Sequence, residues 1–146
     1  MPQPRTEITA LQAAIDLRAV VARLLRRFRE AGADASLTPS QASALMRLGK
    51  GGVATVSGLA TVEKVRPQSM AAIVEALESQ GLVTRSQDPS DGRRQIIALT
   101  ETGSARIEGA RDAAAAWLEH ALATELSADD LRTLSDATAI LDRLLA

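Results

Sequence analysis

Residues 55–100 read TVSGLATVEKVRPQSMAAIVEALESQGLVTRSQDPSDGRRQIIALT, and this stretch decides the fold. Its middle predicts a helix over residues 66–80, because Pro67 suits a first helical turn and the apolar residues that follow keep a 3.6-residue spacing. Those apolar residues are Met70, Ile73, Val74 and Leu77. Gly81 comes next, and glycine is favoured where a left-handed backbone ends a helix.

Two short strands are predicted after this helix, at residues 82–85 and 95–100, where apolar residues alternate in the second strand. Between them lies a turn-forming loop over residues 87–94. It contains Pro89, Asp91 and Gly92, followed at its far end by Arg93 and Arg94. The sequence therefore predicts a hairpin with a basic end.

Upstream, a shorter helix is expected to begin at Thr55 or Ser57 and to run to Val62, with Leu59 and Ala60 facing inward. Helix, tight turn, helix and hairpin in this order form the layout of a winged helix-turn-helix. The helix of residues 66–80 is then expected to lie in the DNA major groove, and the hairpin is the wing. The fold class that follows is mainly α with a small β-hairpin wing.

This stretch resembles the MarR family of bacterial transcription regulators. The helix exit at Gly81 and, above all, the acidic-then-basic wing carry the resemblance. The matching residues are Leu59-Ala60, Val65-Arg66-Pro67-Gln68-Ser69, Leu77-Glu78-x-x-Gly81-Leu82-Val83, Asp88-Pro89-x-Asp91-x-Arg93 and Leu99-Thr100. The flanking helices also come in the family's order, so the resemblance covers nearly the whole chain.

Helical patterns flank the winged stretch on both sides. Residues 7–31 keep a helical period that Gly32 ends, a capping box at Thr38 opens the next helix before Gly49–Gly52 stop it, and helices follow Thr100 and Ser127. We expect residues 1–36 to form an N-terminal dimerisation helix, residues 37–100 the DNA-binding domain, and residues 101–146 the C-terminal dimerisation helices. The resemblance implies a homodimer, and a two-fold dimer suits a palindromic operator.

Seven residues are expected to contact double-stranded DNA or to hold a side chain that does. They are Ser40, Arg66, Gln68, Ser69, Asp91, Arg93 and Arg94. Gln68 suits adenine and Arg66 suits guanine, although a phosphate contact for Arg66 is an equal alternative. Ser40 and Arg94 are assigned to the DNA backbone. The resemblance implies that Asp91 holds the guanidinium of Arg93 so that it enters the minor groove.

At two positions the chain departs from the family pattern. Ala72 stands where many relatives carry a polar residue facing DNA, so base reading rests on fewer side chains. Gly92 stands where a first wing arginine is common. The family usually senses small aromatic or phenolic molecules, and the resemblance implies a repressor that such a ligand releases. A constitutive DNA-binding or scaffold protein without an effector is the alternative that the sequence leaves open.

The composition excludes several other functions. The 146 residues include one Trp, one Phe, no Tyr and no Cys, which argues against stacking platforms for single strands and rules out disulfides and thiolate metal sites. His120 is the single histidine, so we expect no metal site, no cofactor and no enzyme. Neither a signal peptide nor a membrane-spanning run is recognisable, and we expect a cytoplasmic protein without a membrane partner.

The charge distribution is uneven although the net charge is only −1. Residues 37–100 hold seven basic and five acidic side chains, whereas residues 101–146 hold four basic and nine acidic ones. This asymmetry suits a protein that meets phosphates on one side. Four arginines also cluster late in the first helix: Arg23, Arg26, Arg27 and Arg29. They form either a solvated helix face or a surface for phosphate or a partner.

Overall fold

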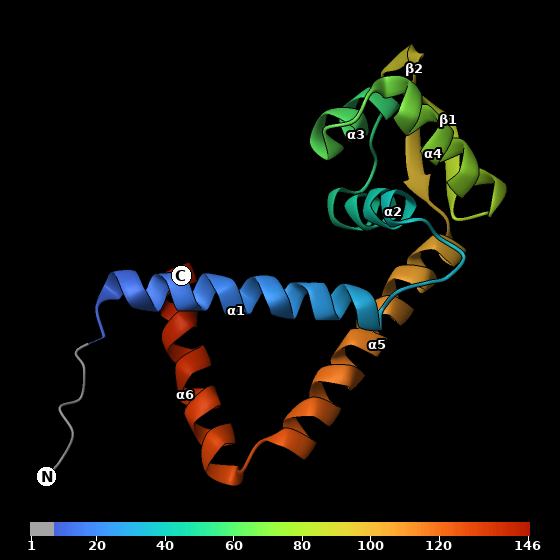
Figure 1. The fold of residues 1–146 in the computed structure, drawn as a ribbon. Coiled ribbons are helices and arrows are strands. Elements are labelled where there is room, and N and C mark those ends of the chain that lie inside the picture. The colour runs from blue at the N-terminus through green and yellow to red at the C-terminus, as the bar shows by residue number, and fades with distance from the viewer. Residues whose placement is uncertain (1–7) are drawn as a thin grey trace, which may run out of the picture. The chain divides into compact units, whose positions relative to one another are not determined.

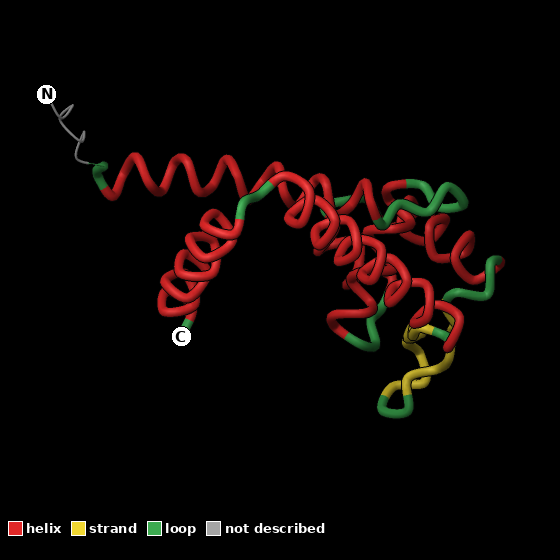
Figure 2. Tube along the Cα trace, turned by 90° about the horizontal axis from the view of Figure 1, so that it is seen from below, coloured by secondary structure: helices red, strands yellow, loops and turns green. Residues whose placement is uncertain are grey.

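The computed structural model describes residues 8–146 and is mainly helical, with one two-stranded hairpin (Figures 1 and 2). The elements are α1 (Ala10–Ala31), α2 (Pro39–Gly51), α3 (Val56–Glu63), α4 (Pro67–Ser79), β1 (Val83–Asp88), β2 (Asp91–Leu99), α5 (Glu101–Glu125) and α6 (Ala128–Leu145). They form two compact units. One is Gly32–Asp112, and the other combines the described residues up to Ala31 with Ala113–Ala146. Helix α5 is continuous and contributes to both.

The core of the unit Gly32–Asp112 lies between the three helices α2, α3 and α4 and the hairpin (Figure 1). Helix α4 packs against α2, α3 and β1, as a helix-turn-helix requires. The buried residues are Ala44, Leu45, Leu48, Leu59, Ala60, Met70, Val74, Leu77, Leu82, Val83, Ile97 and Ile107. Leu59, Ala60 and three of the four periodic residues of α4 therefore lie inside, as the sequence predicted, while Ile73 is partly buried and packs against this core.

Local side chains fix the ends of α2 and α3. The Thr38 hydroxyl accepts from the backbone of Gln41 while the Gln41 side chain accepts from the backbone of Thr38, which confirms the predicted capping box. Thr55, rather than Ser57, caps α3. Helix α2 continues through the first glycines of the run, and its last residue is Gly51. Gly52 is the C-cap, with φ 74°.

Helix α4 begins and ends close to the predicted residues. Arg66 is its N-cap, with extended backbone at φ −69° and ψ 145°, and Pro67 is its first residue. Gly81 follows the helix with φ 71°, the left-handed backbone for which glycine was expected. Thr100 caps α5 by accepting a hydrogen bond from the Gly103 backbone.

The hairpin differs from the prediction. Its strands reach Asp88 and resume at Asp91, so the turn is much shorter than the expected eight-residue loop. The pairs Gln87↔Gln95 and Asp88↔Asp91 follow one another in the register. Gly92, Arg93 and Arg94 therefore form a bulge in β2, which is where the two arginines lie. A single bridge from Ala54 to Ile97 adds the connection before α3 to the sheet.

The other unit consists of α1, the later part of α5, and α6. The expected start of α1 at Glu7 lies outside the described residues, and the helix begins at Ala10. The rings of Phe28 and Trp117 meet edge to face with centroids 5.9 Å apart, and the Arg27 guanidinium lies 5.5 Å from the Trp117 centroid. Arg26 and Arg27 also pair with Glu30, which favours a helix face for the arginine cluster.

Neither α1 nor α6 has a buried residue in the single chain. Each nevertheless carries a row of large apolar side chains at helical spacing that remain exposed. They are Leu11, Ile15, Val20, Val21 and Leu25 on α1, and Leu131, Leu134, Ile140, Leu144 and Leu145 on α6. Across residues 8–146, no helix combines the length and the apolar character needed to cross a membrane.

Candidate nucleic-acid interface

The first turn of α4 presents three polar side chains to solvent. Arg66, Gln68 and Ser69 are all exposed, and within the described residues none of these side chains makes a hydrogen bond or an ion pair. Arg66 provides no side-chain cap for the helix, so its guanidinium is free for another partner. The structure thus brings these three predicted residues together at one helix end, where side chains reach base edges in helix-turn-helix proteins.

Ser40 lies in the first turn of α2 and is also exposed. It borders a small hollow of about 210 Å³ that Val65 and Met70 also line. Ser40 is therefore near the turn that leads into α4. A contact from Ser40 to the DNA backbone stays an expectation, for which the helix N-terminus supplies a favourable dipole charge.

Glu63, the last residue of α3, connects this turn to α2. Its carboxylate accepts a 2.5 Å hydrogen bond from the Ser43 hydroxyl and a 2.8 Å hydrogen bond from Nε of Arg47. The hydrogen bond from Ser43 and then that from Arg47 lower the pKa of Glu63. The sequence analysis did not find this cluster. Its signal was the spacing of Ser43 and Arg47, four residues apart on one face of α2.

Two aspartates organise the wing. The Asp88 carboxylate accepts hydrogen bonds from the Ser90 backbone at 2.8 Å and from the Ser90 hydroxyl at 2.6 Å, and these bonds lower the pKa of Asp88. Asp91 accepts a 3.0 Å hydrogen bond from the backbone N–H of Arg93. In this structure Asp91 therefore holds the backbone of Arg93, and within the described residues it makes no contact with the Arg93 guanidinium.

Arg85 links the wing to α4. It lies opposite Ile97, whose side chain is fully buried, so both side chains point to the face of the hairpin that covers the core. Nε of Arg85 lies 3.0 Å from a carboxylate oxygen of Glu78, near the end of α4. This ion pair couples the hairpin to the helix that is expected to read DNA.

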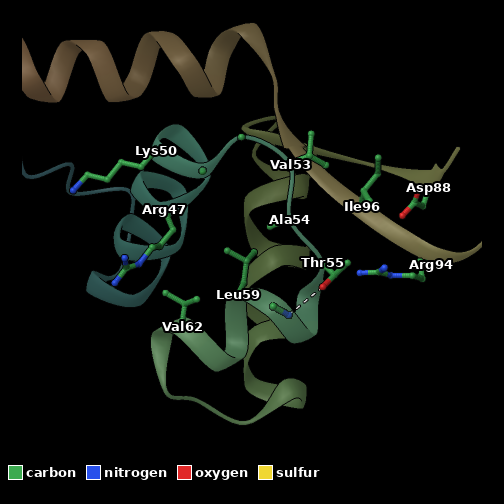
Figure 3. A pocket seen from close by; sticks show the side chains of 13 residues that line it. Arg47, Lys50, Val53, Ala54, Thr55, Leu59, Val62, Asp88, Arg94 and Ile96 are labelled. Atoms are coloured by element: carbon green, nitrogen blue, oxygen red, sulfur yellow. Dashed lines mark hydrogen bonds between the residues drawn. The ribbon is translucent and has the colours of Figure 1, made fainter. Parts of the chain in front are cut away.

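A larger hollow of about 600 Å³ lies between the end of α2, α3 and β2 (Figure 3). Leu59, Val62 and Ile96 give it apolar walls, and Arg47, Lys50 and Arg94 provide positive charge. The Arg94 side chain extends from β2 toward Thr55 at the start of α3, where the Gly58 backbone donates a 3.1 Å hydrogen bond to the Thr55 hydroxyl (Figure 3). No local pattern in the sequence predicts this hollow, since distant segments build it.

Within residues 8–146, no group of three or more His, Cys, Asp or Glu side chains is placed to hold a metal ion. His120 is exposed on α5, in the unit that does not contain α4. Among the described residues, the candidate site therefore consists of exposed polar and cationic side chains at the start of α4 and on the β1–β2 hairpin.

This fold and this surface define a winged helix-turn-helix DNA-binding protein, and known proteins place it further. The model of the MarR family matches residues 37–94. An HTH-type transcriptional regulator from Mycobacterium bovis is 37% identical over 125 residues, which cover 84% of this chain and 87% of that protein. The chain belongs to the MarR family of winged helix-turn-helix transcription regulators.

Solved structures agree with this assignment. A transcriptional regulator from Pseudomonas aeruginosa is 32% identical and superposes with a TM-score of 0.70, covering 92% of this chain and 95% of that one. A mutant of MarR from E. coli is 26% identical with a TM-score of 0.68, covering 97% of this chain and all of the other. These relatives are regulators of transcription rather than enzymes.

Proposed function

We propose that this regulator is a repressor that binds a palindromic operator as a homodimer and is released by a small aromatic or phenolic ligand. The observation that carries the dimer is the row of exposed apolar side chains on α1 and α6. Leu11, Leu144 and Leu145 are 72%, 75% and 86% exposed in the single chain. Contiguous apolar surface of this kind marks protein interfaces, and a two-fold dimer presents two copies of α4 to two half-sites.

Two further proteins support the DNA and repressor parts of the proposal. NicR of Pseudomonas putida, an HTH-type transcriptional repressor, is 33% identical over 81 residues, which cover 56% of this chain and 51% of NicR. A mutant of MepR from S. aureus, bound to an oligodeoxyribonucleotide, shares the fold with a TM-score of 0.67 at 21% identity. The exposed Arg66, Gln68 and Ser69 provide the groups that such a role needs in this chain.

The proposal is tested by selecting DNA duplexes from a random pool with the purified chain. Light scattering then measures the molar mass of the complex with the selected duplex. We expect an inverted repeat whose half-sites are centred about one helical turn apart, bound by two protomers. Protein variants are not needed for this step. A monomer bound to a single asymmetric site would overturn the palindromic homodimer.

The ligand part needs a separate measurement. The hollow of about 600 Å³ has the size of many small-molecule sites, and its cations, among them Lys50 and Arg94, outnumber the carboxylate of Asp88 and so favour an anionic compound. A panel of benzoates and phenols is titrated into the complex with the selected duplex, followed by fluorescence anisotropy. Release of DNA by one of them supports an effector, since a ligand acts only by preferring one state of the protein. No response to any compound favours the alternative, a constitutive DNA-binding or scaffold protein.

A further inference from the structure

The turn between α3 and α4 decides where the exposed first turn of α4 lies. Lys64 adopts left-handed backbone with φ 55°, an unusual conformation for a residue other than glycine. The Val65 backbone then donates a 3.0 Å hydrogen bond to the carbonyl of Ala60, and Arg66 caps α4. Glu63 directly precedes this turn, so any restraint on Glu63 acts within three residues of Arg66.

Two side chains of α2 restrain Glu63. Ser43 and Arg47 hold one carboxylate oxygen each, at 2.5 and 2.8 Å. The Glu63 side chain is only 13% exposed, whereas that of Arg47 is 50% exposed. A charge-assisted pair on a largely covered carboxylate fixes its position more firmly than an exposed surface pair does. Helix α2 thereby holds the end of α3 and the start of the turn.

Simple electrostatics does not explain this carboxylate. Glu63 places a negative charge near a helix end that is expected to meet phosphates, and repulsion there weakens binding to any DNA. It also engages Arg47, which would otherwise be available for a phosphate. A geometric role explains why Glu63 is present although it repels phosphates and engages Arg47. A recognition helix must be held in one orientation to read base edges.

We propose that Ser43, Glu63 and Arg47 form a positioning network that orients the first turn of α4 for sequence-specific reading of DNA. Glu63 acts through the turn that follows it and does not touch DNA. Arg47 serves as the partner of Glu63 and not as a phosphate contact. This inference rests on the proposed role of α4 as the helix that reads base pairs.

The test compares affinity for the duplex selected by the unmodified chain with affinity for a scrambled duplex of equal length. Glu63→Ala is expected to weaken binding to the selected duplex about tenfold, because hydrogen bonds to a charged group are lost. Binding to the scrambled duplex should stay equal or become tighter, because a negative charge is removed and Arg47 is released. Ser43→Ala, a smaller deletion, should lower discrimination in the same direction.

Two further variants separate positioning from charge. Glu63→Gln is expected to recover part of the discrimination, because its amide oxygen still accepts one of the two hydrogen bonds. Glu75→Ala removes a carboxylate from the exposed side of α4 that makes no hydrogen bond or ion pair within the described residues, and it should not lose discrimination. Thermal unfolding of each variant checks that it is folded. If Glu63→Ala does not fold, Ser43→Ala is used in its place to test the network.

Unchanged or tighter binding of Glu63→Ala to the selected duplex would overturn the network. Equal losses on both duplexes, or no recovery in Glu63→Gln, would also overturn it, because a positioning role must act on discrimination. An unmodified chain that binds all duplexes equally would instead contradict the proposed function itself. The two failures are therefore distinguishable.

Discussion

The Thr100 hydroxyl donates a 2.6 Å hydrogen bond to the carbonyl oxygen of Gly81. The same hydroxyl oxygen accepts a 3.0 Å hydrogen bond from the Gly103 backbone, and the Thr100 backbone N–H donates to the carbonyl of Leu82 at 3.1 Å. One residue therefore joins the end of α4, the start of β1 and the first turn of α5. A displacement of this turn of α5 must act on α4 directly.

The close approach at this junction requires glycine at position 103. A Cβ on Gly103 would collide with the carbonyl of Leu82. Because this carbonyl belongs to the backbone, it cannot move aside as the end of a flexible side chain could. We expect Gly103→Ala to lower the free energy of unfolding by about 1–3 kcal/mol, as overpacking of a close contact does. Thermal or urea unfolding followed by circular dichroism measures this change.

Gly109 on the same helix is the matched control. A Cβ there meets nothing within 4 Å. Gly109→Ala should therefore raise stability by about 0.5–1 kcal/mol, because alanine is the better helix former. If both variants change stability alike, the contact between Gly103 and Leu82 does not constrain the junction.

Asp34 predicts a specific loss of stability in acid. The Ser36 hydroxyl, the Ser36 backbone and then Arg106 lower its pKa from 3.8 to about 2. Because the folded pKa is the lower one, the unfolded chain takes up a proton first as the pH falls. The stabilisation from Asp34 is thus present above pH 3.8 and is lost as the pH falls toward about 2.

The midpoint of thermal unfolding, measured at about pH 6 and at about pH 2.5, checks that stability falls in acid as this pKa predicts. Asp34→Asn should narrow the difference between the two midpoints, since it removes the titrating group. Ser36→Ala should narrow it as well, because the Ser36 hydroxyl is the largest cause of the lowered pKa. A midpoint difference that is the same in all three proteins would mean that other carboxylates control acid unfolding.

Sequence reasoning succeeded where neighbouring residues determine the structure. The capping box at Thr38, the helix start at Ser127 and the left-handed Gly81 depend on a few adjacent residues, and all three are present in the structure. The pair formed by Asp34 and Arg106 joins residues 72 positions apart, which no local pattern reveals. The same limit applies to Glu63, because its partners lie on another helix.

The candidate site was predictable to a similar degree. Arg66, Gln68 and Ser69 lie at the helix start where the spacing placed them. The geometry of the wing was not predictable, because turn residues indicate that the chain reverses but do not determine the register between the two strands. Hence the bulge at Gly92–Arg94 and the backbone contact of Asp91 emerged only from the structure.

The backbone contact of Asp91 changes what its substitution should do. Arg93→Ala is expected to weaken operator binding by about 1–3 kcal/mol and to reduce the salt dependence by about one phosphate contact. Asp91→Ala should also weaken binding, because the bulge that presents Arg93 loses its hydrogen bond. Asp91→Asn keeps an acceptor oxygen while removing the charge, so it should bind at least as tightly as the unmodified chain.

Anisotropy titrations at two salt concentrations measure all three wing variants. The comparison of Asp91→Ala with Asp91→Asn is decisive, because both remove the same negative charge. If the two variants bind equally tightly, charge explains the effect and the hydrogen bond to the Arg93 backbone has no role in DNA binding.

Leu144 tests the proposed dimer without disturbing the protomer core. Its side chain is 75% exposed in the single chain, so a charge there costs little unless a partner covers it. Leu144→Glu should remove roughly 1.5–3 kcal/mol of apolar burial per copy and yield monomers at micromolar concentration. Ala139→Glu adds the same charge to the α6 face that carries Arg132 and Arg143, and it should remain dimeric. Light scattering of both variants decides: a Leu144→Glu protein that stays dimeric would remove this face of α6 from the interface.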